Sequence, residues 1–323
     1  MLLLAEPEIR QIVRLDAKSL AAIEAAFVRL SRGEVTVPAP MDYYFPERRG
    51  EVHIKSAHVQ GMKNYALKIA SGFYENSRLG LQNSSGMVIV LSAETGYPQA
   101  LLMDNGYLTD VRTAMAGAIA AKYLAKQRVA TVGIIGVGIQ ARFQLEALRT
   151  VRKFERVLVY GRKQEAVKAY CTEMMAACGV PVSPAVSVSE LVRLSDLVVT
   201  TTPSREPLVM AEDVHPGLHI TAMGADLAGK QELQPQVLAR ADRIACDLES
   251  QCRRVGELQH AAGVAHVAEL GQIISGAEPG RQNDNEITVC DLTGIGVQDA
   301  AIANLAHEDA VAQNIGQTLT SAH

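Results

Sequence analysis

Short apolar runs alternate with longer amphipathic stretches between about residues 128 and 246. The runs have the composition of strands buried on both faces, and the stretches between them have helical spacing. This alternation predicts a doubly wound parallel sheet with crossover helices. The predicted strands are VATVGII (129–135), RVLVY (156–160), DLVVTTT (196–202), HITAMG (219–224) and RIACD (243–247), with helices over 141–151 and 164–178.

The first 125 residues follow a different pattern. A helix is expected over 20–30, followed by a proline-rich turn and by segments in which apolar and polar residues alternate. Such alternation is typical of an antiparallel sheet with one exposed face. The predicted strands are VHIKSAHV (52–59), YALKIAS (65–71) and MVIVLSA (87–93), and a small-residue helix follows over 116–125.

These patterns predict an α/β protein of two domains. The tail over 297–312 is again helical, and we expect it to return to the N-terminal region. A Rossmann dinucleotide-binding domain is therefore predicted over 127–294, and an α+β domain over 1–126 and 295–323. With 323 residues, 48% of them hydrophobic, the chain is long enough for two ordinary cores.

Composition and charge remove several classes of function. The 31 basic and 35 acidic residues leave a formal charge of -4, and no Lys/Arg block suits a nucleic-acid partner. No apolar run approaches the roughly 18 to 20 residues of a membrane span, so a cytoplasmic protein is expected. The cysteines are odd in number and form no CxxC, which favours reduced thiols. They are Cys171, Cys178, Cys246, Cys252 and Cys290.

A glycine-rich turn separates the first predicted strand of the parallel sheet from the next helix. It reads Gly136-x-Gly138-x-x-Ala141. In this fingerprint the glycines permit a tight turn and close approach to a pyrophosphate, and the small third residue lets helix pack on strand. The helix N-terminus adds N–H groups for phosphates. The alternative is a glycine turn without a ligand. The predicted cofactor-binding residues are Gly136, Gly138, Ile139, Gln140, Ala141, Arg162, Thr202 and Met223.

The end of the second strand indicates which dinucleotide binds. An NAD site usually has an acidic residue there for the ribose 2′-OH, whereas this chain reads Tyr160-Gly161-Arg162-Lys163. Arg162 could pair with a 2′-phosphate, so NADP(H) is favoured and NAD(H) is possible. In the alternative reading Arg162 is a solvated turn residue.

Three further motifs carry a family resemblance. They are LKIASGFYEN (67–76), LTDVRTAMAGAIAA (108–121) and GADLAGKQEL (224–233). Together with the glycine turn, the chain resembles the ornithine cyclodeaminase/mu-crystallin family over essentially its whole length. GEVHIKSAHV, LGLQNSSG and LLMDNGYLTDVRTA look most like the ectoine-utilisation branch. The resemblance implies a homodimer whose substrate and dimerisation domain is formed by the N-terminal region and the C-terminal helix.

The resemblance also implies site residues. The family's substrate-carboxylate arginine falls on Arg112, its pocket lysine on Lys68 and its catalytic acid on Asp226. A guanidinium fork, a compact ammonium and a proton carrier at the carboxyl end of a strand suit these roles. Without the family, the alternatives are a surface ion pair for Arg112, a solvated lysine for Lys68 and a turn or N-cap residue for Asp226.

One substrate loop departs from the family pattern. Where the family often carries an arginine shortly after a proline, this chain has Met41, with Arg48 and Arg49 further on. Lys55 is expected to point into the same pocket if its strand pairs as in the family. Period-2 alternation alone leaves open whether Lys55 instead lies on a solvated face.

No metal site is predicted. Pro216 and Gly217 interrupt the spacing between His215 and His219, and His260 and His266 have no ligands at suitable spacing.

The implied chemistry is hydride transfer at a carbon bearing nitrogen. We expect NAD(P)H-dependent reduction of a small imino acid, or the reverse amino-acid oxidation, with Asp226 as acid or base and Lys68 beside it. A substrate derived from ectoine, hydroxyectoine or a related diamino or dicarboxylic acid is expected. The alternatives are a cyclodeaminase that recycles NAD internally and a non-catalytic NADP(H)-binding protein similar to mu-crystallin.

Overall fold

The computed structural model describes residues 1–320, and its contacts divide the chain into two compact units. Unit 1 comprises residues 1–112 together with the chain from 295 onward, and unit 2 comprises 113–294. The sequence-based boundary at 126 follows the end of helix α3 (Tyr107–Leu124), whereas the contacts place the division inside this helix. The two assignments therefore differ in which unit receives most of one unbroken helix.

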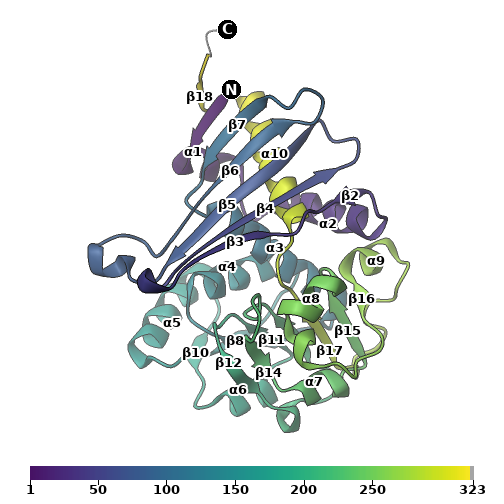
Figure 1. The fold of residues 1–323 in the computed structure, drawn as a ribbon. Helices are drawn as coiled ribbons and strands as arrows, with labels where there is room; N and C mark the ends of the chain where they lie inside the picture. The colour runs from purple at the N-terminus through teal and green to yellow at the C-terminus, as the bar shows by residue number, and fades with distance from the viewer. Residues whose placement is uncertain (321–323) are drawn as a thin grey trace. The chain divides into compact units, whose positions relative to one another are not determined.

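Unit 1 contains a sheet in the order β18-β1-β7-β6-β5-β4-β2, with β3 paired to β4 (Figure 1). The predicted strands over 52–59, 65–71 and 87–93 are confirmed as β4, β5 and β6. The sheet is mixed rather than antiparallel, because β1 pairs in parallel with β7. The strands are β1 (Leu2–Ala5), β2 (Val35–Thr36), β3 (Met41–Phe45), β4 (Gly50–Val59), β5 (Asn64–Phe73), β6 (Ser84–Ser92), β7 (Pro98–Met103) and β18 (Gln317–Thr318).

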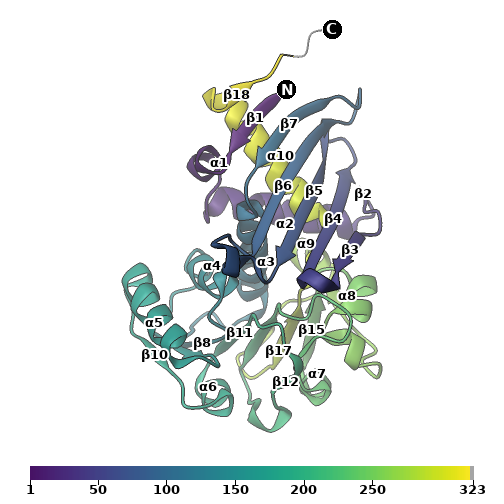
Figure 2. The same cartoon turned by 60° about the vertical axis from the view of Figure 1, so that its left-hand side comes forward.

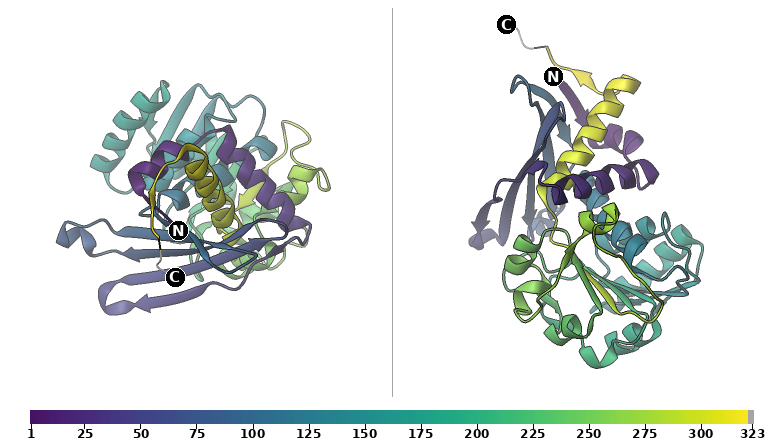
Figure 3. Two further views of the ribbon diagram at one scale, coloured as in Figure 1. Left: turned by 90° about the horizontal axis from the view of Figure 1, so that it is seen from above. Right: turned by 90° about the vertical axis from the view of Figure 1, so that its right-hand side faces the viewer.

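The helices of unit 1 pack on one face of this sheet (Figure 3, left). They are α1 (Glu6–Ile12), α2 (Ala17–Ser31) and α10 (Gly296–Gln313), with short 3-10 turns at Pro46–Arg48 and Asn76–Leu79. Helix α10 packs against α2, β4 and β5, so the C-terminal helix lies beside elements of the N-terminal region. Ala57, Ala66 and Val88 point toward these helices and are almost fully buried.

Helix α10 lies against the sheet of unit 1 (Figure 2), and its first residue approaches β4 closely. A Cβ on Gly296 would lie 2.4 Å from the carbonyl oxygen of Ser56 in β4, so a side chain there would displace the helix. Most of the helix is small and apolar and is buried on nearly every side. Gln298 and Asp299 are consequently held in the interior of unit 1.

Unit 2 contains a parallel sheet in the order β10-β9-β8-β11-β13-β17-β15-β16. All five predicted strands are present as β8, β9, β11, β13 and β15, whereas β17, inserted between β13 and β15, was not predicted. The strands are β8 (Thr131–Ile135), β9 (Arg156–Tyr160), β10 (Val182–Pro184), β11 (Leu197–Thr200), β13 (His219–Ala222), β15 (Arg243–Cys246), β16 (Ala268–Glu269) and β17 (Thr288–Asp291), and β12 (Arg205–Val209) pairs separately with β14 (Gln231–Leu233).

The order of the strands reverses at β8, because the chain passes to β9 on one side and then to β11 on the other. Open α/β sheets bind ligands beyond the carboxyl ends of their strands at such a reversal. None of the helices in residues 1–320 has the length and apolar character needed to cross a membrane. The helices of unit 2 that follow α3 are α4 (Ile139–Leu148), α5 (Gln164–Cys178), α6 (Val188–Leu194), α7 (Pro235–Arg240), α8 (Glu249–Val255) and α9 (Leu270–Ser275), with 3-10 turns at Ala211–Asp213 and Glu257–His260.

Candidate active site

The predicted glycine turn lies at the reversal of the unit 2 sheet, between β8 and α4. Gly136 has a φ of 112°, and a Cβ on it would lie 2.5 Å from the Thr201 hydroxyl oxygen, so glycine is required there. A Cβ on Gly138 would meet nothing within 4 Å. The backbone at Gly138 therefore borders open space at the start of α4, as a phosphate-binding turn requires.

A cavity of about 570 Å³ opens beside this turn. It is lined by the glycine turn, by the segment after β9 and by residues 201–204 after β11. Gly136, Gly138, Arg162 and Thr202 belong to its lining, so four of the predicted cofactor-binding residues come together here. The residues present fit a dinucleotide, because the open backbone, the helix N-terminus and a basic residue after β9 meet in one cavity.

The other predicted cofactor-binding residues lie outside the lining of this cavity. Ile139 is half exposed at the first position of α4, and Ala141 is fully buried where the helix packs on the sheet. Gln140 is partly buried between them. Met223 follows β13, and its N–H donates to the Thr200 carbonyl.

Arg142 holds the glycine turn in place and was not identified from the sequence. Its guanidinium donates to the carbonyls of Val137 (2.7 Å) and Gly138 (3.1 Å), and it also pairs with Glu173. The ring of Tyr170 lies under the guanidinium carbon, 5.2 Å from it. An arginine in the first turn of the helix after a glycine fingerprint was the available signal.

In unit 1, Lys68 and Arg112 meet at a buried carboxylate that the sequence analysis missed. The Lys68 ammonium lies 2.9 Å from the Asp299 carboxylate, and Nε of Arg112 lies 3.0 Å from it. Arg112 also donates through Nη1 to Gln298 at 3.1 Å. All four side chains are buried. We call Lys68, Arg112 and Asp299 the cation cluster.

The register of β4 and β5 settles which face Lys55 occupies. Lys55 is directly opposite Lys68, and opposite residues of an antiparallel pair lie on the same face. Lys55 is therefore on the face toward α10, beside the cation cluster. Met41 is opposite Ile54 and so lies on the other face, away from the cluster. Met41, which stands where the family often has an arginine, therefore adds no side chain to the inner face.

Burial and neighbouring charges alter the proton affinity of the cation cluster. The pKa of Lys68 is lowered to about 7, chiefly by desolvation; Arg112 and Lys55 also lower this pKa, and the Asp299 carboxylate opposes them by raising it. Burial alone would raise the pKa of Asp299, but the three cations outweigh it and lower that pKa. Lys68, Arg112 and Lys55 thus all stabilise the charged form of the buried Asp299 carboxylate.

Asp226 lies in the loop after β13, at the carboxyl edge of the unit 2 sheet. Its side chain is 49% exposed and accepts from the Lys230 ammonium at 2.6 Å. An accessible carboxylate at this edge can exchange protons with a bound ligand or with water.

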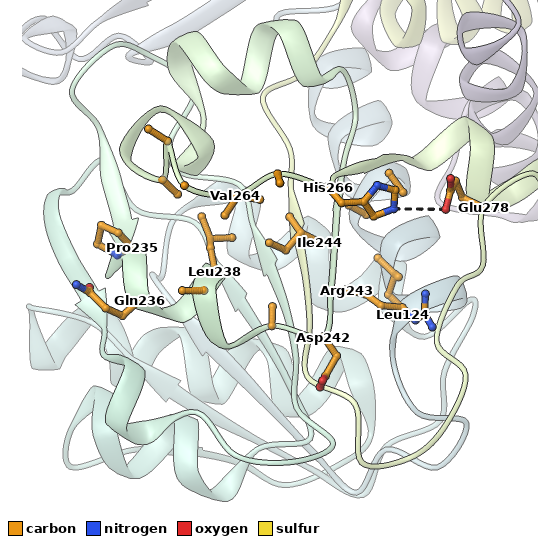
Figure 4. Close-up of a pocket in the computed structure, with 18 of the residues that line it drawn as sticks. Leu124, Pro235, Gln236, Leu238, Asp242, Arg243, Ile244, Val264, His266 and Glu278 are labelled. Atoms are coloured by element: carbon orange, nitrogen blue, oxygen red, sulfur yellow. Dashed lines mark ion pairs between the residues drawn. The ribbon is translucent and has the colours of Figure 1, made fainter.

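A second cavity of about 590 Å³ in unit 2 contains none of the predicted catalytic or cofactor-binding residues (Figure 4). Leu238, Ile244 and Val264 line it, and at its rim His266 lies 3.5 Å from Glu278. His260 also lines it and contacts the Lys230 carbonyl. Within residues 1–320, no three His, Cys, Asp or Glu side chains gather in an arrangement that could hold a metal ion.

Comparisons with known proteins agree with this architecture. The sequence profile of the ornithine cyclodeaminase/mu-crystallin family matches residues 1–314. The alanine dehydrogenase of Archaeoglobus fulgidus is 38% identical over 98% of each chain. The iminosuccinate reductase of Paracoccus denitrificans is 36% identical over 98% of this chain and 99% of its own. The structure of Thermococcus litoralis Δ1-pyrroline-2-carboxylate reductase, solved with NADH and L-proline, is similar with a TM-score of 0.92 and 29% identity, covering 99% of this chain and all of that one.

Proposed function

This chain belongs to the ornithine cyclodeaminase/mu-crystallin family, and we propose that it reduces a small imino acid with NAD(P)H, or catalyses the reverse amino-acid oxidation. One observation carries the proposal: the buried Lys68 and Arg112 share a single carboxylate, Asp299. A cluster of this composition suits the carboxylate of an amino or imino acid. The named relatives act on substrates of this class.

Arg112 and Lys68 are proposed to bind the substrate carboxylate. A guanidinium presents a planar fork and an ammonium a compact charge, so together they fix both position and orientation. Asp299 near Nε and Gln298 at Nη1 orient the Arg112 guanidinium. Because all of these groups are buried, they exclude water and act at low effective dielectric, where a charge–charge contact is strong.

Unit 2 is proposed to bind the dinucleotide in the cavity beside Gly136 and Gly138. When bound, the nicotinamide supplies or accepts the hydride. Arg162 in the same cavity favours NADP(H), since its guanidinium can pair with a 2′-phosphate, while NAD(H) is possible. The Thermococcus relative was solved with NADH, so a direct comparison of the two dinucleotides is needed.

Asp226 is proposed as the acid or base that handles the proton at the substrate nitrogen or at water. Its exposure permits rapid exchange with solvent. Lys68 is the second proton carrier, because with a pKa of about 7 its side chain is present both as the ammonium and as the neutral amine at neutral pH. These roles for Asp226 and Lys68 need no further titratable group.

A cyclodeaminase is the second candidate, since the family includes that activity. Ornithine carries a distal ammonium, and Lys55 adds a cation beside Lys68, so a cationic side chain would meet like charge there. A distal carboxylate or a neutral polar group fits better. The resemblance to the ectoine-utilisation branch stays a prediction about the substrate.

We also propose a homodimer formed through the outer face of the unit 1 sheet. Helices of unit 1 cover only the other face (Figure 3, left). The strand registers place a continuous set of apolar side chains on the outer face, and four of them are between 36% and 53% exposed. A patch of this kind usually marks an interface. The set includes Met41, Tyr43, Ile54, Leu67, Ile69, Met87, Ile89, Leu101 and Met103.

The proposed reaction is tested by following reduced-nicotinamide absorbance with cyclic imines and with keto acids plus ammonia. Stoichiometric consumption of NADPH or NADH, with an amino acid as product, is expected. Ornithine is the matched test substrate for the second candidate. Release of ammonia and proline from ornithine without net change in the dinucleotide would establish the cyclodeaminase instead, and dinucleotide binding without any turnover would indicate the non-catalytic protein.

A further inference from the structure

We propose that Glu232 is a positioning residue. It holds the loop that borders the dinucleotide cavity against the loop that carries Asp226. The inference rests on the proposed function, because it concerns binding of the same dinucleotide. Glu232 lies at the centre of β14 and is fully buried. Its role is separate from substrate contact, since it acts through the backbone of other residues.

Both oxygens of the Glu232 carboxylate accept hydrogen bonds from the carboxyl edge of the unit 2 sheet. Oε1 accepts from the Thr202 N–H at 2.6 Å. Oε2 accepts from the Gly224 N–H at 2.8 Å and from the Thr200 hydroxyl at 2.6 Å. One side chain thus joins the loop after β11 to the loop after β13.

Each of these loops carries a residue of the candidate site. Thr202 lines the dinucleotide cavity, and Gly224 precedes Asp226 by two residues. The two loops also meet closely, because a Cβ on Gly224 would lie 2.1 Å from the Thr202 carbonyl oxygen. A shift at Glu232 would therefore move the wall of the cavity and the backbone leading to Asp226 together.

The backbone of β14, the strand that carries Glu232, is held by hydrogen bonds to a second glutamate. Glu257, also buried, accepts from the backbone N–H groups of Glu232 (2.8 Å) and Leu233 (3.1 Å). Asp291 accepts from the Leu258 N–H at 3.0 Å and so fixes the turn that carries Glu257. Because β14 is held in this way, the Glu232 carboxylate has a defined position from which to orient the loops.

An amide cannot replace the Glu232 carboxylate at this position. In Glu232→Gln one oxygen becomes an NH₂ group, which donates and cannot accept. In one amide orientation the NH₂ faces the Thr202 N–H, and in the other it faces the Gly224 N–H. Either way a buried backbone N–H loses its acceptor, so one loop is released while the side-chain volume is unchanged.

The test measures dinucleotide binding, which does not depend on knowing the substrate. The chain has no tryptophan, so emission from bound NADH or NADPH is observed without energy transfer from indole. Glu232→Gln is expected to weaken binding at least tenfold. The matched control is Asp196→Asn: Asp196 accepts from the Ala130 and Thr131 N–H groups at 2.7 and 3.0 Å, but at the amino ends of the strands. The Asp196→Asn variant should have a lower Tm than the wild type, but its affinity for the dinucleotide should change by less than about twofold.

The outcomes separate this inference from the proposed function. If the wild type binds neither NADH nor NADPH, the proposed function fails. If the wild type binds and Glu232→Gln binds equally well, Glu232 has no positioning role. Equal weakening by both variants would assign the effect to general destabilisation and also overturn the inference.

Hydrogen exchange of the wild type provides a test that needs no variant. Glu232 is the acceptor for the amides of both Thr202 and Gly224, so both are expected to exchange much more slowly than amides of exposed loops. Exchange of these two amides at the rate of an unprotected loop would overturn the inference even if Glu232→Gln failed to fold.

Discussion

The Lys68 ammonium lies 2.9 Å from the Asp299 carboxylate, and both side chains are at most 4% exposed. Removing one partner of such a pair leaves an uncompensated buried charge, which typically costs about 3 to 5 kcal/mol. Lys68 has another option, because its pKa of about 7 lets it lose its proton near neutrality. The pair therefore sets the pH range in which Lys68 is a cation.

Asp299→Asn should move the pH dependence of reduction to lower pH. Asp299 raises the pKa of Lys68, so without it burial, Arg112 and Lys55 lower that pKa below about 7. In the wild type, kcat/KM should fall as pH rises through about 7, where Lys68 loses its charge. In the variant this fall should occur about one to three pH units lower, the usual effect of one adjacent charge. Superimposable kcat/KM profiles would show that Lys68 does not control the reaction.

Asp226→Asn should lower kcat by about 10² or more, the usual contribution of a positioned acid or base. Asp226 is half exposed and paired with Lys230, so its loss should affect stability little. Fluorescence titration should give nearly the wild-type dinucleotide affinity. Normal turnover in the variant would make Asp226 a structural loop residue.

Lys55→Glu should raise KM for substrates with a distal carboxylate much more than it changes cofactor affinity. The reason is that Lys55 faces the same side of the sheet as Lys68, where an added anion would repel such a substrate. Lys63→Glu, an exposed charge reversal in the turn of the same hairpin, is the matched control and should leave KM unchanged. Equal KM values for the Lys55 variant and the wild type would remove Lys55 from the substrate site.

Arg162→Asp should weaken NADP(H) binding strongly and spare or improve NAD(H) binding. A carboxylate repels a 2′-phosphate and accepts from a 2′-OH. Arg128→Asp makes the same charge change at a highly exposed arginine of unit 2 and serves as the control. Titration of both dinucleotides against the three proteins checks the prediction, and tighter binding of NAD(H) by the wild type would contradict the proposed preference.

Ile69→Glu should dissociate the proposed homodimer, because Ile69 lies on the outer face of the unit 1 sheet and a buried unpaired carboxylate there is unfavourable. Val311→Glu places the same charge on α10, where Val311 is 58% exposed, and should leave the mass unchanged. Sedimentation equilibrium gives the mass of each protein. A dimeric Ile69 variant, or a monomeric wild type, would exclude this interface.

Features that depend only on neighbouring residues could be predicted from the order of amino acids. A short stretch of sequence was enough to predict each of five strands of the parallel sheet, helices α4 and α5 and the glycine turn. The reason is that the periodicity of buried residues and the geometry of glycine are local properties. The family motifs in the same way pointed to Lys68, Arg112 and Asp226. None of these inferences required knowledge of which segments meet.

Features that depend on segments far apart in the chain followed only from the folded structure. Asp299 is separated from Lys68 by 231 positions, and only the packing of α10 on β5 brings them together. The face occupied by Lys55 depended on strand register, which alternation alone does not fix. The parallel pairing of β1 with β7 and the insertion of β17 likewise arise from contacts between distant segments. Such contacts form because they bury apolar surface and satisfy polar groups across the whole fold. A local sequence pattern does not show which distant segments will pair.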